Sequence, residues 1–322
     1  MPHAAVPPRW GIVSTIKAPL REIADFAAHH LDLGAHRLLI YLDDDNPEAF
    51  DRLSQHPKIR IEKADEANWR RKNRPAKHQI RQAHNARHAY HRRAGDLDWL
   101  AHIDVDEFLW PTRPLAEQLQ ALPADCTVAR ARPIEALSSE GTDLPPGTTC
   151  FKAMTVHRAT RDDQTGAIYP TYGGHMNGGF LSHVAGKIFI RTGLDDVVVK
   201  IHNAIIAGIQ NPGQQDLPDT ELCHLHAPSL SDWLSRFRYR HEKGSYRPEL
   251  SPTRSRESGG LTMHELFTFI LDTEGEAGLV AFYDEVCRAT PGLRARLDAH
   301  GLLRCHRLDL DAKRAKHFPD LA

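Results

Sequence analysis

Short apolar runs and helix-type runs alternate along the first third of the sequence, and this alternation constrains the fold more than any other feature. Strands are predicted at 10–16, 36–45, 58–64 and 98–109, and helices at 19–34, 47–56 and 75–95. Strands separated by single helices form βαβ units, which lie parallel in one sheet and bind ligands at their carboxyl ends. The sequence therefore predicts an α/β fold with a mostly parallel sheet flanked by helices.

The middle of the chain, roughly 123–215, changes character. Gly, Pro and Thr become frequent, and short strands are predicted at 126–134, 186–193 and 197–206, where they would complete the sheet and border a cleft. A basic helix opening on a serine cap is predicted at 229–246, followed by an exposed loop at 247–260 and several helices. We therefore expect a main domain at 1–240 and a loop with a helical extension at 241–322.

Charge and composition narrow the classes of partner. Hydrophobic residues make up 41% and charged residues 26%, as in soluble globular proteins, and the formal net charge is −1. This balance argues against a surface devoted to nucleic acid or anionic membrane. The basic run 68–88 has few aromatic residues for base stacking, so it is interpreted either as a solvated helix face or as a neutralising surface for a diphosphate. Lys77 and Arg81, four residues apart, would share one helix face.

Targeting and cysteine patterns predict a cytoplasmic protein. The five cysteines are widely spaced and include no C-x-x-C pair, which fits a reducing compartment better than a disulfide framework. The amino terminus lacks the apolar region of a signal peptide, and no apolar run reaches the ~18 residues that span a bilayer. No transmembrane segment is expected, and contact with a membrane surface is left open.

The run "WLAHIDVDEFLW" places acids directly after an apolar segment. Side chains at i and i+2 of a strand share a face, so Asp104 and Asp106 could converge on one cation. Carboxylate oxygens suit Mg²⁺ or Mn²⁺, which usually share their ligand shell with substrate phosphates. The alternatives are a solvated acidic loop and a helix start, with Asp106 as the N-cap before Glu107.

Other polar residues are predicted near the same sheet edge. Asp43 opens "DDDNP" at the end of the second strand, where it would accept hydrogen bonds from a nucleoside, although this stretch is also good turn chemistry. In "CHLHAPS", His224 and His226 would share one strand face. A single histidine is more often structural than a ligand, but either imidazole could complete a carboxylate metal site.

Four blocks of the sequence resemble one enzyme family. "WGIVSTIKAPLREIADFAAHHLDLGAHRLLIYLDDDNPE" and "DWLAHIDVDEFL" resemble the opening and D-x-D blocks of family-2-like nucleotide-sugar glycosyltransferases, and "GKIFIR" and "HLHAPSLSDWLSRFRYR" resemble two later blocks. The resemblance spans roughly residues 9–240. It implies the GT-A fold, a single Rossmann-like domain that uses a nucleoside-diphosphate sugar and usually Mn²⁺ or Mg²⁺.

The resemblance also implies roles for particular residues. Asp104 and Asp106 would bridge the metal and the diphosphate, and Asp43 would touch the nucleoside. Ser14, Thr15 and Lys17 would border the base and ribose, while His224 or His226, with His202 as a further candidate, would complete the metal shell. Candidates for phosphate or acceptor contacts are Lys77, Gln79, Arg81, Lys187 and Arg236. Two departures are "KAPLRE", which lacks the family's acid after the lysine, and "LDDDN" in place of D-x-S-x-D.

The expected activity is transfer of a sugar, with a UDP-sugar favoured as donor, to a hydroxyl of a glycan or lipid-linked acceptor in surface or secreted glycan synthesis. An inverting enzyme needs an acid near that hydroxyl. The candidates are Glu135, Asp163 and Glu221, with Asp162 beside them, and none has a decisive sequence context. The alternatives are an inactive nucleotide- or sugar-binding module and a metal-dependent phosphohydrolase. The hydrolase would have its D-x-D at the first strand, whereas here the acids lie about a hundred residues into the chain, which argues against it.

Overall fold

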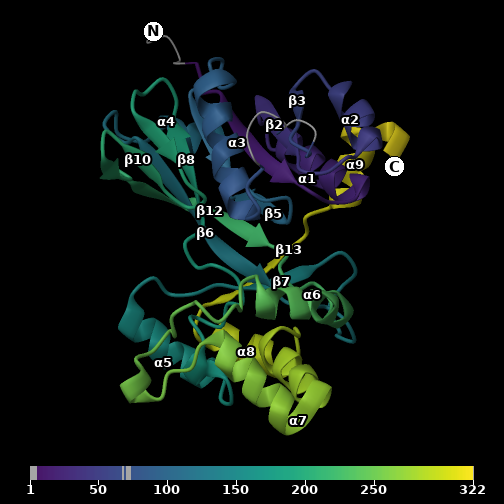
Figure 1. Cartoon of the computed structure of the whole chain (residues 1–322), viewed down its shortest axis with the longest axis vertical. Helices are drawn as coiled ribbons and strands as arrows, with labels where there is room; N and C mark the ends of the chain where they lie inside the picture. Colours follow the sequence, from purple (N-terminus) through teal and green to yellow (C-terminus); the bar gives the residue numbers. More distant parts are fainter. Residues whose placement is uncertain (1–5, 67–68, 70–73, 322) are drawn as a thin grey trace. The chain divides into compact units, whose positions relative to one another are not determined.

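The computed structural model describes residues 6–66, 69 and 74–321. The fold contains two compact units, each built from separate stretches of chain (Figure 1). The first unit comprises Met1–Pro133, Ala185–Leu222 and Asp309–Ala322, and the second comprises Ile134–Val184 and Cys223–Leu308. The predicted division at residue 240 stays a prediction, and it would fall within helix α6 (Leu230–Glu242).

The first unit contains the predicted alternation of strands and helices. Four parallel strands occur in the order β4-β1-β2-β3, and they are β1 (Trp10–Ile16), β2 (Arg37–Leu42), β3 (Ile59–Lys63) and β4 (Trp99–His102). The helices between them are α1 (Leu20–Asp32), α2 (Pro47–Ser54) and α3 (His78–Arg92). The α/β class and the parallel sheet flanked by helices are therefore confirmed.

Antiparallel strands extend this sheet beyond β4. The strand β8 (Lys187–Arg191) pairs with β4, and β6 (Val128–Ala136) pairs with β8. A separate three-stranded sheet contains β9 (Val197–Val199), β10 (Ala204–Ile206) and β11 (Ile209–Gln210). The run predicted as one strand at 197–206 is thus two short strands of a hairpin. Val13 and Leu39 of the main sheet share one buried core with Ala86 and Tyr90 of α3 and with the strands of the small sheet.

The segment predicted as a single strand at 98–109 is two strands joined by a turn. The strand β4 ends at His102, and β5 (Glu107–Pro111) begins at Glu107. The backbone N–H of Glu107 donates to the carbonyl of Asp104 at 3.1 Å, which closes a β-turn over Asp104–Glu107. The D-x-D acids therefore lie in a turn, not on one strand face, and the alternative of a helix N-cap at Asp106 is wrong because a strand follows.

Two buried histidines join α1 to β5. The Nε2 atom of His29 lies 2.8 Å from the carbonyl oxygen of Leu109, and the ring of His30 stacks on Phe108. Burial, with a smaller contribution from Lys313, lowers the pKa of His29 to about 3, and burial lowers the pKa of His30 well below its usual range. Both imidazoles are therefore neutral in the folded protein at physiological pH.

These histidines should make stability depend on pH. In the unfolded chain His29 binds a proton below its ordinary pKa of 6.5, whereas in the folded protein it does so only near pH 3. The free energy of unfolding therefore decreases as the pH is lowered from 6.5 to 3. The slope reaches about 1.4 kcal/mol per pH unit for each such group. His29→Gln should lose part of this slope, as measured by urea unfolding at pH 7.5 and 5. Equal slopes in the variant and the wild type would contradict the prediction.

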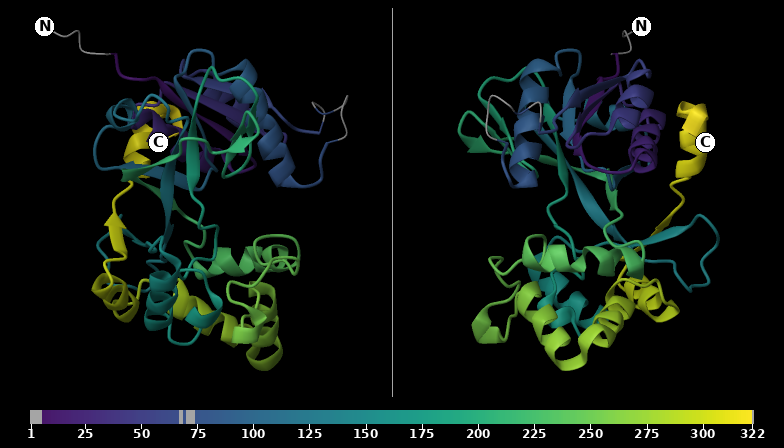
Figure 2. Two further views of the ribbon diagram at one scale, coloured as in Figure 1. Left: turned by 90° about the vertical axis from the view of Figure 1, so that its left-hand side faces the viewer. Right: turned by 45° about the vertical axis from the view of Figure 1, so that its right-hand side comes forward.

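The carboxyl-terminal segment returns to the first unit as α9 (Leu310–His317), which packs beside α1 (Figures 1 and 2). Complementary charges join the two helices: Lys316 pairs with Asp32 at 2.6 Å, Arg21 pairs with Asp311 at 2.9 Å, and Arg314 pairs with Asp25. The sequence predicted helices in this region, but it did not predict that the last helix would pack on the first.

The second unit contains α6, α7 (Met263–Val286) and α8 (Pro291–Ala299), which lie in the region predicted to be helical. It also contains α5 (Arg158–Ile168), a helix that the sequence did not predict. Ser229 caps α6 by accepting from the backbone N–H of Asp232 at 3.0 Å, as the sequence predicted. Gly275, with φ of 64°, interrupts the helical backbone within α7. Trp233, Phe267 and Phe282 pack together in the core.

Four further strands and helices complete the two units. The strand β7 (Thr149–Lys152) pairs antiparallel with the end of β6 and with β13 (Leu303–His306), a strand within the region predicted to be helical. The four residues of β13 are too few for an alternating pattern to stand out in the sequence. The remaining elements are α4 (Leu115–Gln120) and β12 (Gln215–His224), the latter pairing with β5 and β6.

Cys150 of β7 and Cys305 of β13 form a disulfide. The cysteine pattern was interpreted as fitting a reducing compartment better than a disulfide framework, and it did not indicate this pair, because strand pairing brings together two residues that are 155 positions apart. Cys126, Cys223 and Cys287 are buried free thiols. The cytoplasmic location rested in part on the cysteine pattern and stays a prediction.

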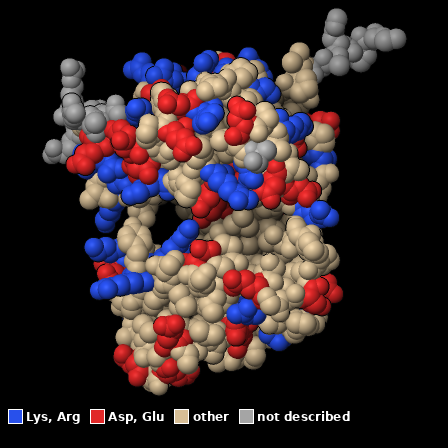
Figure 3. All heavy atoms as spheres, turned by 90° about the vertical axis from the view of Figure 1, so that its right-hand side faces the viewer, with Lys and Arg blue, Asp and Glu red and all other residues tan. Residues whose placement is uncertain are grey.

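Surface charge agrees with the near-zero net charge. Acidic and basic side chains are interspersed on the face that Figure 3 shows. In the described part of the chain, none of the helices combines the length and the apolar character that crossing a bilayer needs.

Candidate functional site

Three neighbouring parallel strands end at one edge of the first unit's sheet. The strand β1 pairs with β2 on one side and with β4 on the other. Asp43 directly follows β2, Lys17 follows β1, and Asp104 lies two residues after β4. The carboxyl edge of a parallel sheet is where α/β folds bind ligands, so this edge is the candidate site.

Asp43 is the centre of a buried charge network. Arg81 donates through Nη2 to Oδ2 at 2.6 Å and through Nε to Oδ1 at 2.8 Å, while Arg74 donates to Oδ1 at 2.9 Å and His78 contacts Oδ2 at 3.0 Å. Burial acts to raise the pKa of Asp43, but these hydrogen bonds from His78, Arg81 and Arg74 outweigh it and hold the pKa far below its usual range. Asp43 is therefore a carboxylate at any ordinary pH.

A pocket of about 480 Å³ opens beside Asp43. Most of its side chains are carboxylates, and the complete lining is Lys17, Asp43, Asp44, Asp45, Asp65, Glu66 and Arg74. Carboxylates accept hydrogen bonds and repel phosphate, so this pocket suits the hydroxyl and N–H donors of a nucleoside better than a diphosphate.

The Asp104 carboxylate is held by two buried side chains. Lys187 of β8 lies with Nζ 2.7 Å from Oδ2, and Gln82 of α3 donates to Oδ1 at 2.5 Å. Glu107 accepts from the backbone N–H of Asp104 at 2.9 Å and lies 3.5 Å from the Lys187 ammonium. Burial acts to lower the pKa of Lys187, but Asp104 and Glu107 outweigh it and raise the pKa, so the ammonium stays charged.

The helix α3 presents a buried polar face that the sequence only partly predicted. Arg81 was predicted, while Gln82 and Asn85 were missed; Asn85 donates to Thr15 Oγ1 at 3.1 Å. The signal was a set of polar residues at helical spacing within an otherwise alanine-lined face. Lys77 and Gln79 are exposed, in contrast to buried Arg81, so Lys77 and Arg81 differ in burial although they were expected to share a face.

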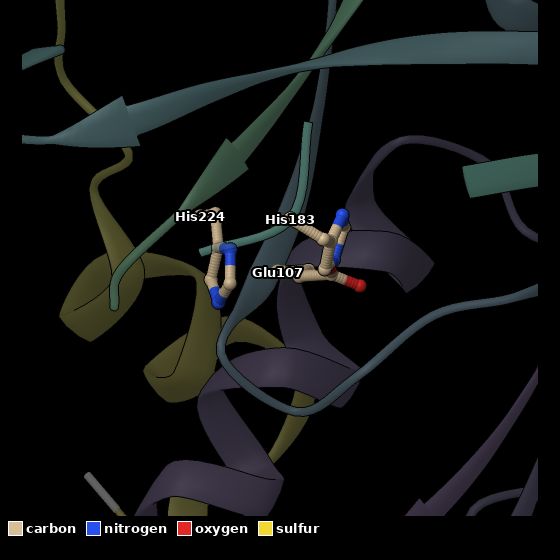
Figure 4. A group of neighbouring side chains, drawn as sticks. All are labelled: Glu107, His183 and His224. Atoms are coloured by element: carbon tan, nitrogen blue, oxygen red, sulfur yellow. The ribbon is translucent and has the colours of Figure 1, made fainter. Parts of the chain in front are cut away.

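Histidines from the second unit offer metal ligands. The rings of His183 and His224 lie with centroids 5.6 Å apart (Figure 4). Imidazole and carboxylate groups are ligands that many divalent metals accept. The sequence predicted His224 but missed His183, which lies in an irregular segment without a motif.

The other two candidate histidines have different neighbours. His226 contacts the Tyr246 hydroxyl through Nε2 at 3.4 Å, and its ring centroid lies 5.3 Å from that of His224. His202, in the first unit, lies with Nδ1 3.0 Å from the carbonyl oxygen of Gly186, next to Lys187 in the chain. The predicted metal role of these histidines stays a prediction.

The catalytic-base candidates lie in three different settings. Glu135 is buried, pairs with Lys152 at 3.1 Å, and accepts from the backbone N–H groups of Leu181 and Ser182. Burial acts to raise its pKa, but Lys152 and these donors lower it to about 2. Asp163 is exposed on α5, and Glu221 is partly buried on β12. Arg236, a phosphate or acceptor candidate, is exposed on α6.

Comparisons with known proteins add little to this geometry. No family model and no curated protein matches the chain. Among solved structures, HddC from Yersinia pseudotuberculosis aligns at 9% identity and a TM-score of 0.27 over 42% of this chain and 65% of its own. The bifunctional glycosyltransferase WbbM aligns at 11% and 0.30 over 59% of this chain and 32% of its own. Mouse xyloside xylosyltransferase 1 aligns at 13% and 0.30 over 58% of this chain and 67% of its own.

The chain thus spans less than two thirds of HddC and about a third of WbbM. These TM-scores are too low for the likeness to carry an argument about fold or activity. The α/β assignment stands on the strand order and helix positions described above.

Proposed function

We propose that this protein is a metal-dependent glycosyltransferase that moves a sugar from a nucleoside-diphosphate sugar to a hydroxyl acceptor. The observation that carries the proposal is the common sheet edge, where Asp43, Lys17 and the Asp104–Glu107 turn follow three adjacent strands. An acid-lined pocket for a nucleoside and a carboxylate turn for a metal-bound diphosphate are the two parts that such a donor requires.

The residues present fit a divalent cation by their chemistry. Asp104 and Asp106 are partly exposed carboxylates in one turn, and hard oxygen ligands are those that Mg²⁺ and Mn²⁺ prefer. A cation there would offset the charge of the leaving diphosphate. The protein's own contribution is to hold Asp104 through Lys187 and Gln82 and to keep Asp43 ionised beside the nucleoside pocket.

We expect UDP or GDP to raise the melting temperature only when Mn²⁺ or Mg²⁺ is present, and we expect Asp106→Ala to lose that shift. The reason is that the diphosphate would be held mainly through the cation. Thermal unfolding with a panel of nucleoside diphosphates, with and without metal, measures the effect. Equal shifts without metal would contradict the D-x-D assignment.

The alternative is a binding module that has lost catalysis. It is favoured by the setting of Glu135, whose carboxylate is committed to a buried ion pair and two backbone donors. Turnover of a UDP-sugar, followed as UDP release with and without a glycan acceptor, separates the two. Binding without release of UDP would support the module. The surface or secreted glycan product and the lipid-linked acceptor remain part of the proposal.

A further inference from the structure

We propose that Lys187 is a positioning residue for the D-x-D turn: it acts through the Asp104 carboxylate and does not itself bind the diphosphate of the donor. This inference deepens the proposed function and rests on it. It also changes the role of Lys187, which the sequence suggested as a direct donor contact.

Burial places Lys187 where it meets carboxylates and not solvent. Lys187 is the first residue of β8 and is 1% exposed. The antiparallel register pairs Phe189 with Ala101, so Lys187 lies level with the chain just beyond β4. Its ammonium is 2.7 Å from Asp104 Oδ2 and 3.5 Å from Glu107 Oε2. A direct contact with phosphate would require this buried group to give up two anionic partners.

The other carboxylate oxygen of Asp104, Oδ1, is held by a side chain of helix α3. Gln82, 6% exposed on α3, donates to Oδ1 at 2.5 Å. The main chain of Asp104 exchanges two hydrogen bonds with Glu107: its N–H donates to the Glu107 carboxylate at 2.9 Å, and its carbonyl accepts from the Glu107 N–H at 3.1 Å. Strand β8, helix α3 and the turn itself thus determine the direction in which the Asp104 carboxylate points.

The three carboxylates of the D-x-D turn give the buried Lys187 ammonium its role. Asp104, Asp106 and Glu107 lie within four residues, and like charges at this spacing repel one another. The buried ammonium lies against two of these three carboxylates from inside the protein, which stabilises the turn in the geometry that receives a ligand.

A double-mutant cycle separates positioning from direct binding. The variants are Lys187→Met, Asp104→Asn and the double variant, and the readout is the affinity for UDP at saturating Mn²⁺ by titration calorimetry. Lys187→Met should weaken binding by roughly 10- to 100-fold, the range for residues that orient a metal ligand. The double variant should bind no more weakly than Asp104→Asn, because the asparagine that replaces Asp104 is neutral and needs no countercharge.

Lys17 provides the matched control, because it is an exposed lysine that lines the nucleoside pocket. Lys17→Met and Asp104→Asn should combine additively in the same cycle. Additive losses for Lys187→Met and Asp104→Asn would instead show that Lys187 contacts the ligand by itself, which overturns the inference. Lys187→Arg should retain more UDP affinity than Lys187→Met, since it keeps the charge.

The same cycle in the free protein keeps the inference testable without a ligand. Lys187→Met should lower the melting temperature of the ligand-free protein, and adding Asp104→Asn should recover a large part of the loss. If the wild type binds no nucleotide with metal, the proposed function fails, while this recovery still decides whether Lys187 acts through Asp104. No recovery in the double variant overturns the inference.

Discussion

Replacing Lys152 with methionine is expected to lower the free energy of unfolding by about 3–5 kcal/mol, because it leaves the buried carboxylate of Glu135 without its countercharge. Both side chains are almost fully buried, and their charged atoms lie 3.1 Å apart. The Lys152 ammonium also donates to the carbonyls of Gly179 at 2.6 Å and Val286 at 3.0 Å, which would lose a donor. Urea unfolding at pH 7 measures the change.

Two comparisons show whether the loss comes from the ion pair. Arg238→Met removes an exposed cation from its pair with Glu242 and should change stability by less than about 0.5 kcal/mol. Adding Glu135→Gln to Lys152→Met should recover part of the loss, because the glutamine side chain is uncharged and keeps an acceptor for the backbone N–H of Leu181. Similar effects for Lys152→Met and Arg238→Met would contradict the prediction.

The contribution of the Glu135–Lys152 ion pair to the free energy of unfolding should decrease at low pH. Folding lowers the pKa of Glu135 from 4.5 to about 2, so its contribution is complete above pH 4.5 and is lost as pH falls toward 2. This range lies mainly below the range in which His29 loses its contribution. Lys152→Met should therefore reduce the acid sensitivity of unfolding at the lower end of the titration.

Removing the disulfide between Cys150 and Cys305 is expected to cost about 2–5 kcal/mol. The bond joins residues 155 positions apart, so the unfolded chain gains much conformational freedom when it is broken. Cys305→Ser should lower the melting temperature measured under oxidising conditions. Thiol titration of the oxidised, denatured wild type should find three free thiols, and reduction should raise this number to five.

The reductant itself supplies the control for this prediction. Dithiothreitol should lower the melting temperature of the wild type and should leave Cys305→Ser unchanged, since that variant has no bond to reduce. Five thiols in the oxidised, denatured wild type would show that the pair is reduced, which would favour the location that the cysteine pattern first suggested.

Local patterns in the sequence determined the elements of the first unit. β-branched runs and helical spacing predicted β1 to β4 and α1 to α3 in their order, because periods of two and 3.6 residues are properties of consecutive residues. The cap at Ser229 was visible for the same reason. The parallel arrangement followed from the alternation, since a helix between two strands brings them side by side in one direction.

Contacts between residues far apart in the sequence, together with the turn at Asp104–Glu107, determined the geometry of the candidate site. The sequence placed Asp104 and Asp106 on one strand face, whereas the hydrogen bond between Asp104 and Glu107 makes a turn. It predicted Lys187 as a donor contact, yet only the pairing of β8 with β4 brings its ammonium to Asp104. Gln82 carried no separate motif, because its importance depends on which face of α3 meets the turn.

The sequence by itself thus determined the α/β class and the acids at the carboxyl ends of β2 and β4, since both depend on neighbours along the chain. The tertiary structure alone decided the partners of those acids, the disulfide between β7 and β13, and the packing of α9 on α1. The physical reason is that a side chain's charge and hydrogen bonds depend on what folding brings within a few ångströms, and no local pattern encodes a pairing over 155 residues.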